Sequence, residues 1–261
     1  MQNKILIALL SFGLFAGCSG TKTVTVDNAI EERQLDTLVV TSFPKENDLE
    51  KTDYTLPVYQ ATATRKHDLL HTSLDVRFDW EKQHLLGKAT LKLKPYFYST
   101  NLLVLDAKGF DFHKVSIVKG NSKMDTEYDY DGAKITIALD REYKRTEEYS
   151  VYIEYTAKPN ELDVTGSSAI TSAKGLYFIN PKGEDKTKPR QIWTQGETES
   201  NSCWFPTIDK PNERCTQDLK LTVEDNFQTV SNGVLKSSNK NADGTRTDHY
   251  VMDLPLSLIH I

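Results

Sequence analysis

The stretch Leu74-Asp-Val-Arg-Phe-Asp-Trp80 decides the fold class of this chain. Its apolar residues alternate with charged ones, which is the period-two pattern of a β-strand with one buried face. Residues 85–93 alternate in the same way, with Ala89 and Leu91 on the apolar side. Because only residues 81–84 separate the two segments, we expect them to pair as a β-hairpin.

Further strand and turn signals continue along the chain. Asp131-Gly132 lies between Tyr128-Asp-Tyr130 and the alternating residues 134–139, and Asp-Gly in that setting predicts a tight hairpin turn with positive φ at both residues. Other segments expected to form strands are residues 102–105, 115–117, 151–155 and 219–223, and Asn232-Gly233 and Asp243-Gly244 predict two more turns. Strands this frequent predict an all-β domain over residues 66–255, either a β-sandwich or a curved open sheet.

Length and charge exclude some function classes. The chain has 261 residues, which is enough for one or two domains with a sizeable core. Its 32 Lys and Arg against 37 Asp and Glu give a formal net charge of -5. Because nucleic-acid binding needs a basic face, we expect no nucleic-acid partner.

The N-terminus has the pattern of an export signal. A short basic start precedes the apolar residues 5–15, which are too few to span a bilayer as a helix. They end in Phe15-Ala-Gly-Cys18, which resembles a bacterial lipoprotein signal cut after Gly17 and lipidated on Cys18. Residues 1–17 are then the signal peptide and residues 18–65 a lipid-anchored polar tether, in the bacterial cell envelope and facing the periplasm or the surface. The alternative is an ordinary secretory signal with an incidental cysteine.

Two further cysteines, Cys203 and Cys215, follow in the predicted domain. A disulfide between them is chemically allowed outside the cytoplasm, and two reduced, buried cysteines are the alternative. The last six residues, 256–261, match one reading frame of a transposon-end sequencing adapter. We therefore expect the natural gene to continue differently after Pro255. A native apolar strand end is the alternative.

The histidines of the chain do not predict a metal site. His67 and His71 have the spacing of a zinc-binding helix, but Asp68 stands where a zinc peptidase needs Glu as its general base. No third ligand follows at a suitable spacing, so we interpret the segment as a solvated strand start. The residues of this chain form no complete catalytic constellation by themselves.

One motif points to a known family. Gln195-Gly-Glu197, followed by Trp204-Phe-Pro-Thr-Ile-Asp209-Lys-Pro211, resembles the end of the N-terminal β domain of the M1 (gluzincin) zinc aminopeptidases in residue type, order and spacing. The resemblance runs loosely from about His67 to Pro255. It implies a saddle-like antiparallel β-sandwich or curved sheet. Many members carry an Arg where this chain has Ser202 or Cys203, so this chain departs from the family pattern at that position.

The resemblance also implies a function. Members of the family remove N-terminal amino acids from peptides with one zinc ion, which a downstream catalytic domain holds. This chain ends before that domain, so we expect it to hold no zinc ligand or catalytic residue and to be inactive alone. By the same resemblance, Glu197 would bind the substrate α-amine and Gln195 would line its pocket. Large aromatic residues bury well and prolines fix a turn, so we interpret the following residues as framework: Trp193, Trp204, Phe205, Pro206, Asp209 and Pro211. The expected partners are peptides with a free N-terminus and, through the lipid anchor, a membrane.

Two other functions fit the sequence. A non-catalytic relative could use the same β fold as a scaffold. An unrelated surface β-sandwich lipoprotein could bind peptides or glycans, for which the 12 tyrosines would offer stacking surfaces.

Overall fold

The structure, a computed structural model, describes residues 58–59, 61, 63–164 and 172–256. The expected signal peptide, the lipidated Cys18, most of the expected tether and residues 257–261 lie outside the described residues. Within the described part, no helix combines the length and the apolar character that crossing a bilayer requires.

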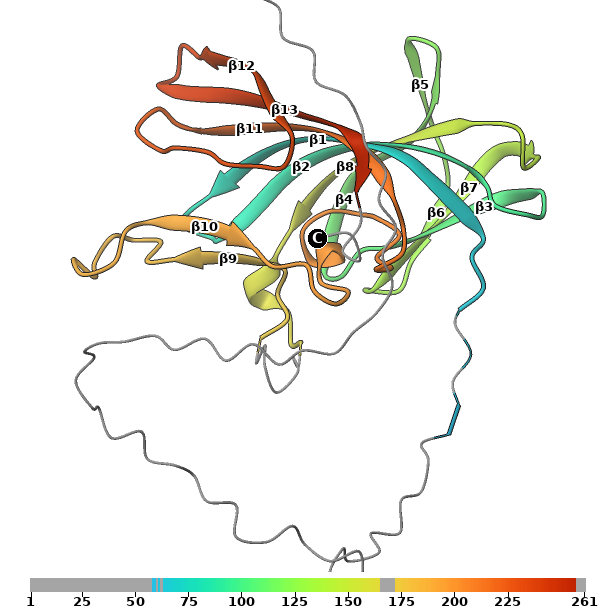
Figure 1. Ribbon diagram of the computed structural model, residues 1–261, viewed down its shortest axis with the longest axis horizontal. Helices are drawn as coiled ribbons and strands as arrows, with labels where there is room; N and C mark the ends of the chain where they lie inside the picture. The colour runs from blue at the N-terminus through green and yellow to red at the C-terminus, as the bar shows by residue number, and fades with distance from the viewer. Residues whose placement is uncertain (1–57, 60, 62, 165–171, 257–261) are drawn as a thin grey trace, which may run out of the picture. The chain divides into compact units, whose positions relative to one another are not determined.

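The largest sheet has eight strands and forms the body of the domain (Figure 1). In spatial order its strands are β12 (Val234–Lys240), β13 (Thr245–Leu256), β11 (Cys215–Glu224), β1 (His67–Asp79), β2 (His84–Pro95), β8 (Tyr149–Ala157), β4 (Phe110–Lys119) and β5 (Ser122–Asp125).

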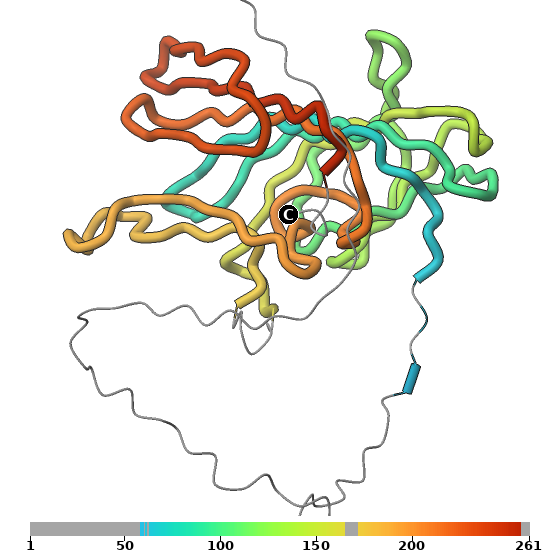
Figure 2. Tube along the Cα trace, viewed as in Figure 1, coloured from blue at the N-terminus to red at the C-terminus, as the bar shows by residue number. Residues whose placement is uncertain are grey.

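Two smaller sheets complete the fold, and Figure 2 shows the path of the chain through the three sheets. One contains β3 (Thr100–Asp106), β7 (Lys134–Tyr143) and β6 (Tyr128–Tyr130), and the other is the hairpin of β9 (Leu176–Ile179) and β10 (Gln191–Thr194). The described helical segments are two short 3₁₀ turns, η2 (Pro159–Glu161) and η3 (Asn201–Cys203). The all-β prediction is therefore confirmed.

The alternating pattern produces the core as expected. On β1, Leu74 and Val76 are buried while Asp75 and Arg77 are exposed. β1 and β2 pair as the predicted hairpin, with Asp79 opposite His84. Apolar side chains of the eight-stranded sheet and of β3 and β7 then form one hydrophobic cluster, which includes Leu91, Leu93, Leu103, Leu105, Ile135, Ile137, Val151 and Ile153. Burial of these side chains is the main stabilising contribution to the domain.

One pairing differs from the implied antiparallel arrangement. β1 and β11 run parallel, with Leu74 opposite Leu219 and Arg77 opposite Thr222. A parallel pair needs a long connection in place of a tight turn. Here β11 returns to β1 only after the chain has passed through the other two sheets, so the local hairpin signals contain no information about this pairing.

Two predicted turns differ in detail. β6 and β7 pair as predicted, but Tyr130 faces Ile135, and only Gly132 has a positive φ, of 92°. The Asp131 side chain stabilises this turn, because its carboxylate accepts hydrogen bonds from the Ala133 and Lys134 backbone N–H groups at 2.8 and 2.6 Å. The Asn232-Gly233 turn follows irregular chain at residues 227–231 and leads into β12.

Candidate functional site

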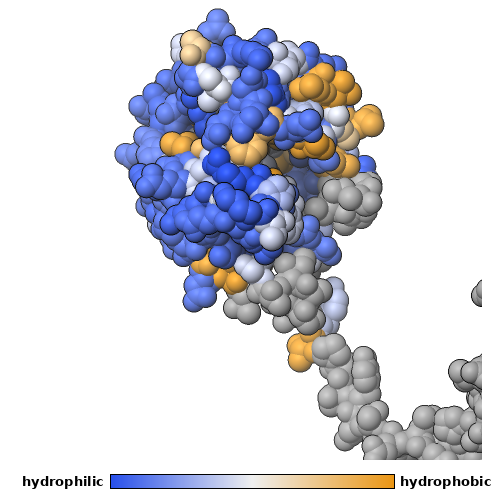
Figure 3. Space-filling view, turned by 90° about the vertical axis from the view of Figure 1, so that its left-hand side faces the viewer, coloured by the Kyte–Doolittle hydropathy of each residue, from blue (hydrophilic) through white to orange (hydrophobic). Residues whose placement is uncertain are grey.

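A groove of about 730 Å³ runs along one side of the eight-stranded sheet. Its lining includes Phe78 near the end of β1, Trp80 directly after β1, and Leu219 and Leu221 on β11. β10 and residues 227–232 form opposite walls. Figure 3 views the end of the molecule where the β9–β10 hairpin and the β11–β13 loops lie, and its surface is mostly hydrophilic with small separate hydrophobic patches.

The motif segment, residues 195–211, follows β10 and is held by backbone hydrogen bonds. The Gln195 N–H donates to the Gly175 carbonyl oxygen at 2.9 Å, and the Ser200 N–H donates to the Gly196 carbonyl oxygen at 3.0 Å. Gly196 allows a close approach, because a Cβ there would lie 2.3 Å from the Asn201 Oδ1 atom. The first half of the segment is therefore a compact turn fixed to the chain just before β9.

Asp209 fixes the second half of the segment. Its carboxylate accepts a hydrogen bond from the Ser202 N–H at 2.8 Å, and its own N–H donates to the Asp106 carboxylate at 3.0 Å. Thr207 forms a β-bridge with Asp106, the last residue of β3. Burial raises the pKa of the Asp209 carboxyl group, although the bonds to Ser202 oppose the shift. Asp209 is thus framework, as expected.

Gln195 and Glu197 lie beside each other on this fixed turn. The Gln195 Nε2 atom is 3.5 Å from the Glu197 Oε2 atom. Glu197 is exposed, and no ion pair of the described residues involves it, whereas Glu199 pairs with Lys210 at 2.8 Å. Neither Gln195 nor Glu197 lines the groove, but Thr194 and Asn201 on either side of them do. The two candidate residues therefore lie together at the rim of the groove.

Of the aromatic residues in the motif region, Trp193 differs from the expected burial. Phe205 is buried and Trp204 is partly buried, as framework residues should be. Trp193 is instead 47% exposed, and its ring stacks on Tyr177 at 4.5 Å. The reason is its place on β10, which pairs only with β9, so its side chain packs on one cross-strand neighbour. Sequence reasoning missed Tyr177, although its alternating context in 176–179 is a strand signal.

The cysteines are both free and buried in the structure. Burial raises the pKa of the Cys203 thiol to about 11 and also raises that of Cys215. Ser202 and Cys203, which stand where many M1 members carry Arg, are fully buried, and the Cys203 Sγ lies 3.4 Å from the Ala173 carbonyl oxygen. There is no space for an arginine side chain at these two positions without rearrangement.

The His67–His71 segment is not a solvated strand start. His67 is 4% exposed, and its ring packs edge-on against Tyr149, while His71 lies 3.2 Å from the Asp218 carboxylate. The expectation was wrong because His67 faces the core side of β1, two residues before buried Leu69. No three His, Cys, Asp or Glu side chains among the described residues lie where they could hold one metal ion. These residues therefore do not fit a zinc site.

His67 predicts a pH-dependent stability. Burial lowers the pKa of its imidazole to about 4, against 6.5 for an exposed ring. The unfolded chain therefore binds a proton first as pH falls, so stability is full above pH 6.5 and is lost between pH 6.5 and 4, by roughly 3 kcal/mol. Urea unfolding of the full chain across this range measures the loss.

The His67→Gln variant should reduce that loss, because its amide does not titrate. His113→Gln is the matched control, since His113 is exposed and bonded to Thr156. An unchanged pH profile in His67→Gln contradicts the assignment of the loss to this residue.

Comparison with known proteins identifies related folds. The chain shares its fold with the M1 zinc metallopeptidase from Deinococcus radiodurans, at a TM-score of 0.62 and 18% identity over 74% of this chain and 40% of that chain. A mutant of the M1 zinc metallopeptidase from the same organism, bound to a Tyr-Ser-Ala substrate, gives a TM-score of 0.61 and 16% identity over 74% of this chain and 41% of that chain. This chain thus spans about two fifths of the length of these metallopeptidases.

A weaker similarity links the chain to a protein of another kind. It is 32% identical over 90 residues to transcription initiation factor TFIID subunit 2 of Gallus gallus, which covers 33% of this chain and 8% of that protein.

The family itself follows from the sequence of the whole β domain. Residues 57–257 match the family described as the peptidase M1 N-terminal domain, and they include all the strands described above. Because this match spans most of the chain, the chain belongs to the M1 peptidase N-terminal domain family.

Proposed function

We propose that this chain is the N-terminal β domain of a zinc-dependent aminopeptidase and that Glu197, with Gln195, binds the α-ammonium group of the peptide substrate. The observation that carries the proposal is the Glu197 carboxylate, which is exposed, has no cation partner among the described residues and lies 3.5 Å from the Gln195 amide on a fixed turn. A solved M1 zinc metallopeptidase with this fold holds a peptide substrate, which supports the same class of ligand here.

The chemistry of the site favours free N-termini. An α-amino group has a pKa of about 7.7–8.0, so much of it is ammonium at neutral pH. A carboxylate binds this cation through charge-assisted hydrogen bonds, and the Gln195 side-chain oxygen is a further acceptor. An internal peptide bond offers no cation and would leave the carboxylate unpaired. The pair therefore selects exopeptidase substrates without taking part in bond cleavage.

The rest of the proposed enzyme must come from residues beyond those described. Glu197 is exposed in this chain, so the partly desolvated surroundings that strengthen an ion pair would have to come from a domain that packs over the turn. Zinc, which supplies Lewis-acid chemistry when bound, would likewise need ligands from elsewhere in the full-length protein. We accordingly propose that the 261-residue chain alone is inactive.

Glu197→Ala in the full-length protein tests the proposal. We expect a higher KM for aminoacyl-p-nitroanilides and a kcat/KM lowered by about tenfold or more, because each decade corresponds to about 1.4 kcal/mol of lost transition-state binding. Steady-state kinetics of the purified enzyme measure both quantities.

Glu199→Ala is the matched control. It removes an exposed carboxylate two residues away whose partner is Lys210, and it should leave kcat/KM near the wild-type value. Wild-type kinetics in Glu197→Ala, or an equal loss in both variants, would overturn the assignment of the α-ammonium site to Glu197.

A second candidate is a non-catalytic scaffold on the same fold. It is favoured by the similarity to TFIID subunit 2, a transcription factor subunit by name. The natural gene beyond Pro255 decides between the two: a His-Glu-x-x-His motif there supports the peptidase, and its absence supports the scaffold. In either case we propose that Cys18 anchors the protein in a bacterial envelope membrane.

A further inference from the structure

Three consecutive aromatic residues project from the loop between β2 and β3. Tyr96, Phe97 and Tyr98 are 47%, 59% and 77% exposed, and the rings of Phe97 and Tyr98 contact each other at 4.9 Å. None of them lines the groove. Isolated exposed apolar residues are normal, but three large rings together on one short loop indicate a contact surface.

The loop lies where several strand ends meet. His67 at the start of β1 faces Pro95, Thr100 at the start of β3 faces Tyr143, and Leu93 faces Tyr149. The loop therefore adjoins the chain leading into β1 and the turn at residues 144–148. Figure 1 shows the start of β1 on the same side as β3 and β7, away from the β9–β10 hairpin. We call this surface the aromatic end, formed by residues 65–66, 96–99 and 144–145.

Direct contacts join the parts of the aromatic end. The Tyr96 N–H donates to the Lys66 carbonyl oxygen at 2.9 Å, and the Arg65 guanidinium lies 4.6 Å from the Tyr96 ring centre. The Arg145 guanidinium lies 5.8 Å from the centre of the Phe97 ring. Aromatic rings and cations are thus interleaved on one surface.

Three cations of this surface are free to meet an anion. Lys66, Lys144 and Arg145 are exposed, and the ion pairs of the described residues include none of them. Three nearby carboxylates have other cation partners: Asp68 pairs with Arg65 and Lys94, Glu147 with Arg141, and Glu148 with Lys92. Glu142 is in none of the ion pairs of the described residues, and its carboxylate accepts a hydrogen bond from the Ser99 hydroxyl at 2.6 Å. The aromatic end therefore combines apolar rings with an excess of positive charge, since three unpaired cations stand against one unpaired carboxylate, although the whole chain is acidic.

We propose that the aromatic end docks on an anionic lipid bilayer. Tyrosine and phenylalanine rings favour the headgroup layer, where an apolar ring body and a polar edge are both accommodated. Lysine and arginine next to the rings bind lipid phosphates, each contributing about 1 kcal/mol near an anionic surface. A membrane fits better than a protein groove, because the rings project from a loop and do not surround a recess.

The place of the aromatic end in the chain supports this partner. Arg65 ends the proposed lipid-anchored tether, so the anchored segment leads into the surface that we assign to the bilayer. Docking would also orient the domain, because the groove and the Glu197 turn lie on other elements than the aromatic end. This inference does not depend on the proposed peptidase activity.

The experiment uses the full chain with the Cys18→Ser substitution and one added cysteine that carries the label. Cys203 and Cys215 are buried, so the added cysteine is the thiol that reacts with the label. Ser99→Cys places an environment-sensitive nitrobenzoxadiazole label on the aromatic end, and Asp243→Cys places it on the β12–β13 turn. With vesicles of phosphatidylethanolamine and phosphatidylglycerol, we expect the emission of the Ser99→Cys label to rise about twofold or more and to be quenched by nitroxide lipids. The Asp243→Cys label should respond to neither.

Two triple variants make the test specific. Tyr96→Ser/Phe97→Ser/Tyr98→Ser should abolish the response of the label at position 99. Val234→Ser/Leu235→Ser/Leu254→Ser removes equally exposed apolar side chains elsewhere and should retain it. The proposal is overturned if the labels at positions 99 and 243 respond equally, or if the label at position 99 does not respond. It is also overturned if the label at position 99 responds without vesicles and in proportion to protein concentration, because that result indicates contact with a second copy of the chain.

Discussion

Replacing Asp248 by alanine is expected to lower the free energy of unfolding by about 3 kcal/mol, because it removes the bidentate counter-charge of the partly buried Arg246 and leaves this arginine its longer pair with Asp225, at 3.4 Å. Asp248 lies on β13 and is 3% exposed. Its two carboxylate oxygens accept hydrogen bonds from the Arg246 Nε and Nη2 atoms, both at 2.9 Å. This bidentate geometry is the strongest form of an arginine–carboxylate pair.

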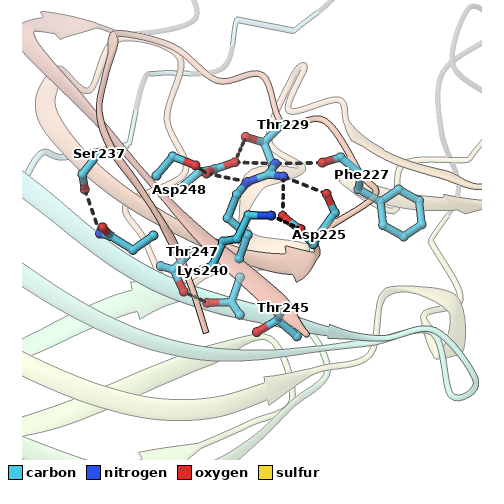
Figure 4. A network of polar contacts seen from close by, with 12 residues as sticks. Asp225, Phe227, Thr229, Ser237, Lys240, Thr245, Thr247 and Asp248 are labelled. Carbon is cyan, nitrogen blue, oxygen red and sulfur yellow. Dashed lines mark hydrogen bonds and ion pairs between the residues drawn. The ribbon is translucent and has the colours of Figure 1, made fainter. Parts of the chain in front are cut away.

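The same carboxylate belongs to a network of polar contacts, which Figure 4 shows and which includes residues at one wall of the groove. The hydroxyl groups of Ser238 and Thr229 donate to it, each at 2.6 Å. Arg246 also donates to the Phe227 carbonyl oxygen at 2.7 Å. Asp248 therefore connects β12 and β13 to residues 227–232, which line the groove. We expect its loss to loosen this wall as well as to destabilise the domain.

The effect should also depend on pH. The Arg246 guanidinium is the main cause that lowers the pKa of the Asp248 carboxyl group to about 2, from 3.8. A lowered pKa in the folded state means that the stabilisation is complete above pH 4 and is lost as pH falls from about 4 to 2. Denaturant unfolding of the full chain at pH 7 and at pH 3 measures both changes.

Asp253→Ala is the control for Asp248→Ala. Asp253 is exposed on the same strand, and its loss should change stability by less than about 0.5 kcal/mol. If the two variants unfold at the same denaturant concentration, the Asp248 network does not stabilise the domain.

Local sequence patterns predicted the strands but not all of their pairings. The alternation in residues 74–80 and 85–93 specifies which side chains are buried, and the β1–β2 hairpin follows because its strands are close in sequence. The parallel β1–β11 pair joins residues more than a hundred positions apart, and no local signal carries that information. His67 failed for a related reason, since the pleat of β1 turns it to the core regardless of its polarity.

The candidate site was predictable to a different degree. The Gln195-Gly-Glu197 motif located two side chains that the structure places 3.5 Å apart, but it came from a family resemblance and not from a physical rule. The groove was not predictable, because its lining comes from β1, β10, β11 and residues 227–232, which only the tertiary fold brings together. Trp193 shows the limit of composition arguments, since its ring lies with Tyr177 on the exposed face of the β9–β10 sheet, whereas Phe178 on the same sheet is buried.

Gly175→Ala is expected to lower the stability of the domain and, at the same time, to disturb the candidate site. Gly175 precedes β9 and has a φ of +72°, where any other residue costs about 1 to 2 kcal/mol. A Cβ at this position would lie 1.9 Å from the Ser200 carbonyl oxygen, a backbone atom that no side-chain rotation can move. The total loss of stability should reach about 3 kcal/mol or more, because overpacking adds to the conformational cost.

The clash is expected to displace the turn that holds Gln195 and Glu197. Ser200 ends that turn, and the Gln195 N–H bonds to Gly175 itself. Gly244→Ala is the matched control, because Gly244 has a φ of +79° with no atom within 4 Å of an added Cβ, so it isolates the conformational cost alone. Urea unfolding of both variants separates the two terms, and full-length Gly175→Ala should also show the raised KM expected for Glu197→Ala. Equal stability losses in Gly175→Ala and Gly244→Ala would mean that the Ser200 backbone can move aside at little cost, and the turn would then not be the fixed support that the α-ammonium site requires.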